Sequence, residues 1–394
     1  MIPSLRAHFN ANFTPQNYHH LLRLMADRCG TPVEFRISET PCFFAKSLLD
    51  QVSQYGKELI RQLDTPEYLK ASQDAIPAEF NAPQESCHPL FIQVDFGLVR
   101  DASGDLQPKL VELQAFPSLY AYQAVLSQTY QEVFSLDANL RYLLGGLDWE
   151  SYKELLRRAI VGNHDPQDVI LMEIDPLHQK TLPDFLLTEK LHGVPTVSIT
   201  DIRKQGNQLF YEMGGRRIPI KRIYNRAIVD ELIRKKIKLN FAFTDDLDVE
   251  WAGHPNWYFR ISKFSLPFLD HVSVPKTWFL DRIERVPDDL QNYVLKPLFS
   301  FAGLGVIINP TKKDLAAIPT DQRSQYILQQ KMNFEPVIQT SYGATKAELR
   351  VMYIWLEELQ PVMLIVRMGR GLMMGVDHNK NMEWVGSSAA FYPS

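Results

Sequence analysis

The chain has 394 residues, of which 45% are hydrophobic and 22% are charged. That length exceeds what one hydrophobic core usually serves, so we expect a globular protein of two or three domains. The 42 basic and 46 acidic residues give a net charge of −4. This balance argues against a broad nucleic-acid surface and allows only a local basic pocket.

Cysteines and apolar runs indicate the compartment. The three cysteines, Cys29, Cys42 and Cys87, have no CxxC spacing and cannot all pair within one chain. The N-terminal stretch lacks the apolar segment of a signal peptide, and no uninterrupted apolar run approaches a membrane span. We therefore expect a soluble protein of the reducing cytoplasm, with no membrane partner and no zinc site.

Helical patterns occupy the first part of the chain. Helices are predicted over residues 16–26 and 45–63, where apolar side chains recur at helical spacing. The adjacent His19 and His20 point to different helix faces, so a metal pair is not expected there. This region could cap a sheet or shape an acceptor pocket.

An acidic hairpin follows these helices. The segments 90–99 and 108–114 are predicted as strands around an Asp/Gly turn. Asp95 lies on the first strand, while Glu112 and Gln114 are two positions apart on the second and project from one face. These oxygen-bearing side chains could hold a hard divalent ion, and a solvent-facing polar edge is the alternative.

The middle of the chain has the pattern of a parallel α/β domain. After a helical stretch over 119–160, strands are predicted over 168–174 and 195–199 with a helix over 181–192 between them. This β-α-β order is typical of a doubly wound domain. No GxGxxG opens the helix, which leaves a Rossmann-type oxidoreductase as a minor alternative.

A hairpin is predicted over 208–220, centred on a Gly-Gly pair, and it leads to a further strand. The strand over 223–226 ends in Asn225 and Arg226, at an edge expected to face a cleft. The basic run 234–238 is predicted to be a solvated helix face.

A lysine stands at the root of a glycine-rich hairpin in the last third of the chain. The segment 293–308 is predicted as two apolar strands around a loop, with Lys296 ending the first strand. Backbone N–H groups of such a loop can close on phosphate oxygens beside the ammonium charge. The pattern suits a nucleoside triphosphate, although a Gly-x-Gly turn is most often only a turn. The small residues of the loop include Ser300, Ala302, Gly303 and Gly305.

The remaining C-terminal segments complete the pattern. A helix is predicted to start at 274–277, and strands are predicted over 326–331, 348–355 and 361–367. The last two strands pair across an acidic turn, and Arg367 and Arg370 follow one another closely at the end of the second.

In their order, these segments resemble the nucleotide-gripping half of ATP-grasp enzymes. The motifs are Val294-Leu-Lys-Pro297 with Phe301-Ala-Gly-Leu-Gly-Val306, then Tyr326-Ile-Leu-Gln-Gln-Lys331, Glu348-Leu-Arg350 and Arg367-Met-Gly-Arg370. The metal-motif strand that usually follows them is instead resembled by Lys109-Leu-Val-Glu-Leu-Gln-Ala-Phe-Pro-Ser118. This displaced order is similar to the circularly permuted ATP-grasp family, which includes glutathionylspermidine synthetase-like ligases. A cysteine–histidine amidase segment is not found.

The resemblance implies an α/β, ATP-grasp-like fold with circular permutation. Residues 1–160 would hold an N-terminal helical region and the metal-binding strands of the core. Residues 161–270 would form a Rossmann-like pre-ATP-grasp domain, and residues 271–394 the ATP-binding lid and phosphate-binding strands.

The resemblance also implies roles for individual residues. Lys296 and the loop of Ser300, Ala302, Gly303 and Gly305 would bind phosphates, and Gln329, Gln330 and Lys331 would read adenine through backbone groups. Asp95, Glu112 and Gln114 would bind Mg²⁺. Arg350 and Arg367, with Arg370 as a weaker candidate, would neutralise the transferring phosphoryl group, and Asn225 and Arg226 would bind the substrate carboxylate.

The implied activity is an ATP- and Mg²⁺-dependent carboxylate–amine ligase that works through an acyl-phosphate. Its substrates would be small or peptide-like, and a homodimer is expected because ligases of this build are often dimers. One departure is Gln114, where the family has Asn. The added methylene moves the amide oxygen by about 1.3–1.5 Å, whereas Mg²⁺ distances tolerate about 0.2 Å. The alternative is therefore a catalytically degenerate ATP-grasp module that binds nucleotide or a peptide-like ligand without turnover.

Overall fold

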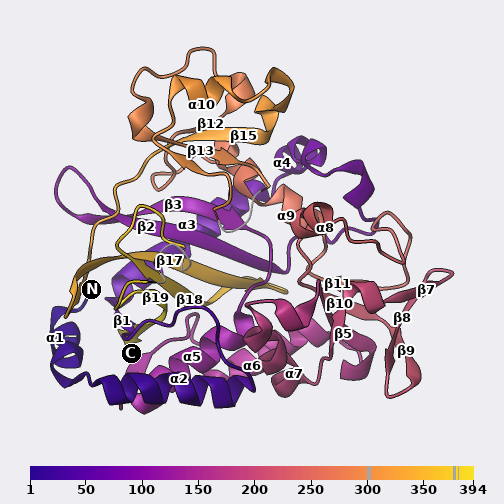
Figure 1. Ribbon diagram of the computed structural model, residues 1–394, viewed down its shortest axis with the longest axis horizontal. Helices are drawn as coiled ribbons and strands as arrows, with labels where there is room; N and C mark the ends of the chain where they lie inside the picture. The colour runs from indigo at the N-terminus through magenta and orange to yellow at the C-terminus, as the bar shows by residue number, and fades with distance from the viewer. Residues whose placement is uncertain (300–302, 376–378, 380) are drawn as a thin grey trace.

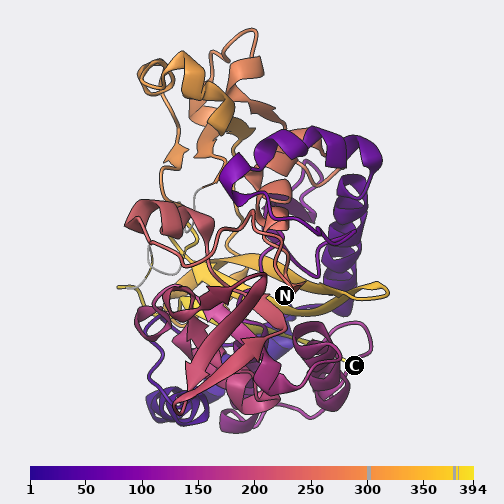
Figure 2. The same cartoon turned by 90° about the vertical axis from the view of Figure 1, so that its right-hand side faces the viewer.

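The computed structural model describes residues 1–299, 303–375, 379 and 381–394. Figure 1 separates three parts: a lid at the top, a large sheet in the middle and a parallel α/β unit at the lower right. Figure 2, turned by 90°, shows the lid projecting away from the other two parts. The mixed α/β class expected from the sequence is confirmed.

The large central sheet draws strands from both ends of the chain. Its strands are β1 (Cys42–Phe43), β2 (Phe91–Arg100), β3 (Leu106–Gln114), β4 (Leu140–Arg141), β16 (Ile338–Thr340), β17 (Gly343–Trp355), β18 (Leu359–Gly369) and β19 (Gly386–Pro393). The main order is β1-β19-β18-β17-β2-β3, with β16 beside β17 and β4 beside β19. Both predicted hairpins, β2–β3 and β17–β18, are confirmed, and β2 pairs with β17.

One face of this sheet is covered by α3 (Lys46–Leu63), which confirms the helix predicted there. Its buried residues recur at helical spacing, so one stripe of the helix faces the strands. Gly56 allows close approach, because a Cβ at that position would lie 2.0 Å from the Tyr353 hydroxyl. That hydroxyl donates a hydrogen bond to the Ser53 carbonyl over 2.8 Å. Helix and sheet together enclose the largest apolar cluster of the molecule.

The opposite face of the sheet has an apolar half and a charged half. Helices α5 (Tyr120–Val133) and α6 (Trp149–Val161) pack on the apolar half, against Phe91, Met352 and Ile365. The helical stretch predicted over 119–160 is thus two helices. Between them β4 joins the sheet edge, and Asp148 caps α6 through a hydrogen bond from the Ser151 backbone N–H.

Short helices complete the N-terminal region. They are α1 (Pro3–Asn12), α2 (Pro15–Cys29) and α4 (Pro66–Ala71), and α2 includes the helix predicted over 16–26. The α2 helix begins where Thr14 accepts a hydrogen bond from the Asn17 N–H, and it packs against α5. Among the described residues, we find no helix with the length and apolar character to span a bilayer.

The parallel α/β unit confirms the predicted β-α-β pattern. Its strands β5 (Val169–Glu173), β6 (Thr196–Ser198), β10 (Arg222–Asn225) and β11 (Glu250–Ala252) run parallel in the order β11-β10-β5-β6, and α7 (Leu182–His192) connects β5 to β6. A separate antiparallel sheet contains the predicted hairpin, with β7 (Arg203–Gln205), β8 (Gln208–Met213) and β9 (Arg216–Ile220). Helix α9 (Asn256–Arg260) follows β11.

Only the first part of the basic run at 234–238 lies on a helix. Helix α8 spans Val229–Lys235 and ends where Lys236 adopts a left-handed conformation, with φ of 51°. Arg234 and Lys235 form ion pairs with acidic residues four positions earlier on this helix. The run is solvated as expected, but the predicted helix stops within it.

The lid is a four-stranded antiparallel sheet. Its strands are β12 (Thr277–Phe279), β13 (Tyr293–Pro297), β14 (Ile307–Ile308) and β15 (Tyr326–Gln330), in the order β12-β15-β13-β14, with α10 (Lys312–Ala316) beside them. The lysine hairpin and the strand over 326–331 are confirmed. The helix predicted from 274–277 is wrong, because that segment leads into β12. Aromatic residues favour strands, and Phe279 of β12 is buried against Phe264.

Candidate functional site

The charged half of the central sheet carries side chains that alternate with core residues. On β17, Leu349 is buried in the core beside α3, so its neighbours Glu348 and Arg350 project from the other face. Across the strands, Arg350 lies opposite Asp95 of β2, and Glu348 lies opposite Arg367 of β18. Four ionisable side chains from three strands therefore meet on one face of the sheet.

Asp95 is the centre of this ion-pair cluster. Arg350 donates hydrogen bonds to both of its carboxylate oxygens, from Nε and Nη2, each over 2.6 Å. Arg367 donates to Asp95 and to Glu348. Forked, charge-assisted bonds of this kind are strong, and Asp95 is only 1% exposed. The cluster therefore holds both arginine side chains in place.

A β-bulge in β3 brings Glu112 beside the cluster. Leu110 and Leu113 are both buried in the core although they are three positions apart, because Val111 is an extra residue between them. The bulge also leaves the Val111 carbonyl outside the strand ladder. This carbonyl accepts a hydrogen bond from the Lys296 ammonium group over 3.0 Å. The lysine at the root of the lid thus lies next to the acidic hairpin.

A second lysine approaches Glu112. Lys263 begins the short 3-10 helix η6 (Lys263–Phe268), and its Nζ lies 3.5 Å from Oε2 of Glu112. The sequence analysis did not select Lys263, since nothing in its local pattern marks it. It reaches the site because the chain between the parallel unit and the lid passes the end of β3, where the Ala115 N–H donates to the Ile261 carbonyl.

Burial and the surrounding charges together shift the pKa values of three groups. Burial raises the pKa of Glu112, but Lys263, Lys296 and the two arginines outweigh it and lower that pKa to about 2. Burial lowers the pKa of Lys296 to about 8, against the attraction of Glu112. Burial raises the pKa of Glu348 to about 7, although Arg367 opposes this shift. Glu112 is therefore an anion at neutral pH, whereas Glu348 exchanges its proton near neutrality.

The lid adds an apolar face above these charges. Val294 of β13 lies opposite both Ile308 of β14 and Gln329 of β15, so the three side chains share one face of the lid sheet. Together with the charged floor they line a cavity of about 510 Å³. That volume is in the range of small-molecule and cofactor sites.

The lining of this cavity is strongly basic. Among the residues that the structure describes, seven basic side chains line it, against the two acidic side chains Glu112 and Glu348. The basic residues are Lys180, Lys263, Lys296, Lys331, Lys346, Arg350 and Arg367. In a chain with a net charge of −4, this local excess marks a site for an anion.

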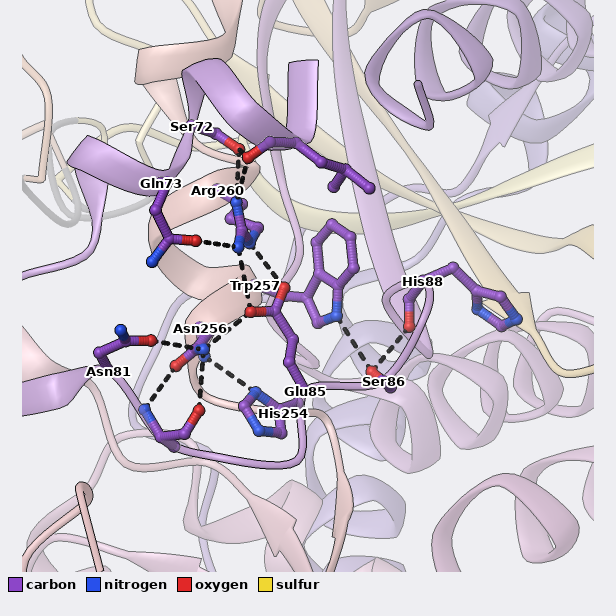
Figure 3. A network of polar contacts seen from close by, with 12 residues as sticks. Ser72, Gln73, Asn81, Glu85, Ser86, His88, His254, Asn256, Trp257 and Arg260 are labelled. Atoms are coloured by element: carbon purple, nitrogen blue, oxygen red, sulfur yellow. Dashed lines mark hydrogen bonds and ion pairs between the residues drawn. The ribbon is translucent and has the colours of Figure 1, made fainter. Parts of the chain in front are cut away.

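A buried polar network around Arg260, shown in Figure 3, lies just before Lys263 in the chain. Arg260, at the end of α9, uses all five of its N–H groups, over 2.6 to 3.1 Å. The acceptors are the Glu85 carboxylate, the Leu69 carbonyl, the Ser72 hydroxyl and the Gln73 carboxamide. Because Lys263 follows three residues later, the network fixes the segment that carries this lysine to the site.

Most of the predicted site residues come together at the cavity. Those that line it are Glu112, Gln114, Lys296, Gly303, Gln329, Gln330, Lys331, Arg350 and Arg367. Asp95 contacts the arginines from below the lining. Ser300 and Ala302 lie outside the described residues, and Gly305 and Arg370 do not line the cavity. Arg370 instead donates to the Glu383 carbonyl over 2.8 Å and to the Thr340 hydroxyl.

Asn225 and Arg226 lie at the carboxyl end of the parallel sheet, away from the cavity lining. Asn225 accepts a hydrogen bond from the Ala227 N–H over 3.2 Å. The Arg226 guanidinium lies 5.0 Å from the Phe116 ring and 5.4 Å from the Phe185 ring. Its Nε and Nη1 have no hydrogen-bond partner among the described residues, although the side chain is buried. Two donors are thus left for an anionic group.

The three side chains expected to hold Mg²⁺ fit an ion only in part. Oδ2 of Asp95 accepts hydrogen bonds from both arginines and Oδ1 accepts one from Arg350, so the three bonds leave Asp95 only one lone pair, on Oδ1, for an ion. Gln114 donates its Nε2 to Gln93 over 2.9 Å, which leaves its own carbonyl oxygen for a ligand. Glu112 and Gln114 therefore fit as ligands. Within the described residues, no three His, Cys, Asp or Glu side chains are grouped as a metal site.

Comparisons with known proteins bear on the fold. Neither the models of known protein families nor the curated protein sequences match this chain. Among solved structures, a glutathione synthetase-like effector from Globodera pallida, in its apo form, matches with a TM-score of 0.58 and 12% sequence identity. The match covers 96% of this chain and 99% of that one. The fold is glutathione synthetase-like. At this identity the likeness concerns the fold alone, and it agrees with the ATP-grasp resemblance only at that coarse level.

Proposed function

We propose that the protein is an ATP-dependent ligase that joins a carboxylate to an amine. The observation that carries this proposal is the cavity between lid and sheet, where seven basic side chains accompany two acidic ones in the described part of the chain. A triphosphate has the charge to match such a lining. The glutathione synthetase-like fold supports ligase chemistry as the use of that triphosphate.

In this proposal the lysines and the lid bind the nucleotide. Lys296 and Lys263 flank Glu112 and would hold phosphate oxygens, with the backbone N–H groups near Gly303 closing over them. Val294 and Ile308 would cover the base. Glu112 and Gln114 would hold Mg²⁺, which supplies further charge neutralisation for the phosphates when it is bound.

The arginine cluster would act on the transferring group. A carboxylate oxygen of the substrate would attack the γ-phosphorus, and ADP would leave. An amine would then attack the acyl carbon, and phosphate would leave with formation of the amide. Arg367, whose Nε has no partner among the described residues, and Arg350 would neutralise the charge that develops in both steps. The unpaired donors of Arg226, with Asn225, would bind a substrate carboxylate.

The proposal also covers the order of the segments along the chain, the oligomeric state and the cellular compartment. We infer a circularly permuted ATP-grasp order, in which the lid and the phosphate-binding strands, within residues 271–394, follow the acidic strands β2 and β3 in the chain. A homodimer in the cytoplasm, acting on small or peptide-like substrates, goes with this inference. Size-exclusion chromatography with light scattering would test the dimer.

The activity is testable with the purified full chain. We expect ATP with Mg²⁺ to raise the melting temperature and ADP release to require both a carboxylate and an amine from a panel of small and peptide-like compounds. Lys296→Ala should abolish the ATP-induced shift. The proposal fails if wild-type protein shows neither ADP release nor stabilisation by ATP.

A second candidate function is nucleotide binding without turnover. The observation that favours it is the engagement of Asp95 with two arginines, together with Gln114 in place of an asparagine. This candidate predicts an affinity for ATP that is unchanged when Mg²⁺ is replaced by EDTA, and no ADP release with any substrate pair. A steep dependence on Mg²⁺ would favour the ligase.

A further inference from the structure

Gln329 is buried in the cavity wall with an unused hydrogen-bond donor. Its side chain is 1% exposed, and Nε2 has no partner within the part of the chain that the structure describes. Burying an amide N–H without a partner costs folding free energy, so most buried amides are paired. The unpaired Nε2 therefore points to an acceptor that a ligand supplies.

The neighbours of Gln329 define the shape of that ligand. Gln329 lies opposite Val294, which in turn lies opposite Ile308, and all three residues line the cavity. Two apolar side chains beside one carboxamide suit a flat heteroaromatic ring that has polar atoms along one edge.

The position of Lys296 indicates how a nucleotide would be oriented along β13. Lys296 is two residues beyond Val294 on the same face of β13, which is roughly 7 Å along the strand. A nucleotide whose phosphates lie at Lys296 would thus have its base toward Val294 and Gln329. The geometry along β13 separates a phosphate end from a base end.

We propose that Gln329 selects adenine through its side chain. Nε2 would donate to N7 of the base, and Oε1 would accept from the N6 amino group, the pairing that glutamine makes with an adenine edge elsewhere. Guanine presents two acceptors, O6 and N7, at this edge and would set one of them against Oε1. The inference rests on the proposed function and deepens it, since it names a side-chain determinant where backbone contacts alone were expected.

The experiment compares ATP with 7-deaza-ATP, which lacks the N7 acceptor, by isothermal titration calorimetry. Wild-type protein should bind ATP roughly 10-fold or more tightly than 7-deaza-ATP and GTP. In Gln329→Met the three affinities should become equal within about twofold. Gln322→Met replaces an exposed glutamine of the lid and should keep the wild-type preference.

A stability measurement separates ligand recognition from a structural role. Without nucleotide, Gln329→Met should melt at or above the wild-type temperature, because the variant removes an unpaired buried donor. Its stabilisation by ATP should fall. A lower melting temperature without nucleotide, with an unchanged ATP shift, would overturn the proposal.

The remaining outcomes distinguish the two proposals. If ATP binds to wild-type protein but 7-deaza-ATP binds equally well, base selection by Gln329 is overturned and the proposed function stands. If Gln329→Met retains the wild-type preference, base selection is again overturned. If no nucleotide binds to wild-type protein, the proposed function fails, and the role of Gln329 fails with it.

Discussion

Two buried arginine–carboxylate networks can be compared in this molecule. Around Arg260, every N–H group of the guanidinium has an acceptor, and the network closes on itself (Figure 3). Around Asp95, Arg367 contacts two carboxylates but keeps an Nε without a partner in the described structure, and it lines the cavity. The first network is complete without a ligand, whereas the second retains a donor for one.

The difference teaches how a buried arginine that supports the fold differs from one that serves a site. A fully paired buried arginine contributes to structure, and its loss leaves several groups without partners. An arginine with a spare donor beside a basic cavity can bind an anion at little cost in reorganisation. Mutations in the two networks should therefore separate stability from ligand binding.

The largest expected effect is on stability at the closed network. Glu85→Ala should lower the free energy of unfolding by about 3–5 kcal/mol, because it leaves Arg260 buried without its carboxylate. Urea denaturation followed by circular dichroism measures this. Glu154→Ala, which breaks an exposed pair with Arg157, is the control and should have little effect. If Glu85→Ala lowers the free energy of unfolding as little as Glu154→Ala does, the Arg260 network does not have the structural role that distinguishes it from the Asp95 network.

The next effect is on turnover at the open network. Arg367→Lys keeps the positive charge but loses the forked donors, so the rate of ADP release should fall by about 10²–10³. Single-turnover kinetics on protein that still melts cooperatively would measure it. Arg157→Lys, at an exposed pair, should leave the rate unchanged. If Arg367→Lys releases ADP at the wild-type rate, Arg367 supports the fold, as Arg260 does, and does not serve the site.

A smaller effect is expected for the lysine that the Arg260 network positions. Lys263→Met should weaken ATP binding by about 10-fold or more, since a hydrogen bond to a charged group is worth about 1.5–3 kcal/mol. Titration calorimetry is the measurement. The matched control is Lys46→Met on α3, where the lysine is exposed and pairs with Asp50. Equal affinities for the two variants would disconnect Lys263 from the site.

The smallest effect concerns pH at Glu348. Its folded pKa of about 7 lies above the ordinary value of a glutamate, so folding favours the protonated form. The stabilisation is present below the unfolded pKa and is lost as pH rises through about 7. Protonation also releases Arg367 for a phosphate. ATP affinity should therefore rise, by less than about 10-fold, as pH falls from roughly 8 to 6.

The control for this prediction is Glu348→Gln, whose side chain stays neutral at every pH. The variant should retain the pH dependence that comes from the triphosphate itself and from Lys296, whose pKa of about 8 lies at the upper end of this range. If wild-type protein and Glu348→Gln show the same pH profile of ATP affinity, Glu348 does not compete with the ligand for Arg367.

Sequence reasoning predicted the local structure of the site well where alternation was clear. The two-residue spacing of Glu112 and Gln114 predicted a strand with a polar face, and a strand was also predicted over 348–355, which carries Arg350. It did not predict the C-terminal strand β19, which lies between β1 and β18 in the central sheet. Nor did it predict the bulge at Val111, because one extra residue leaves no mark in a pattern of period two.

The sequence by itself predicted the strands β2, β3, β13 and β17, the lysine at the root of the lid and the order of these segments, because these depend on local periodicity and turn chemistry. Only the tertiary structure decided which charges meet. It paired Asp95 with Arg350, 255 residues away, and brought Lys263 to Glu112 through a segment with no strand pattern. It also left Nε2 of Gln329 without a partner among the described residues, beside the apolar Val294, a property that depends on every neighbour of the side chain.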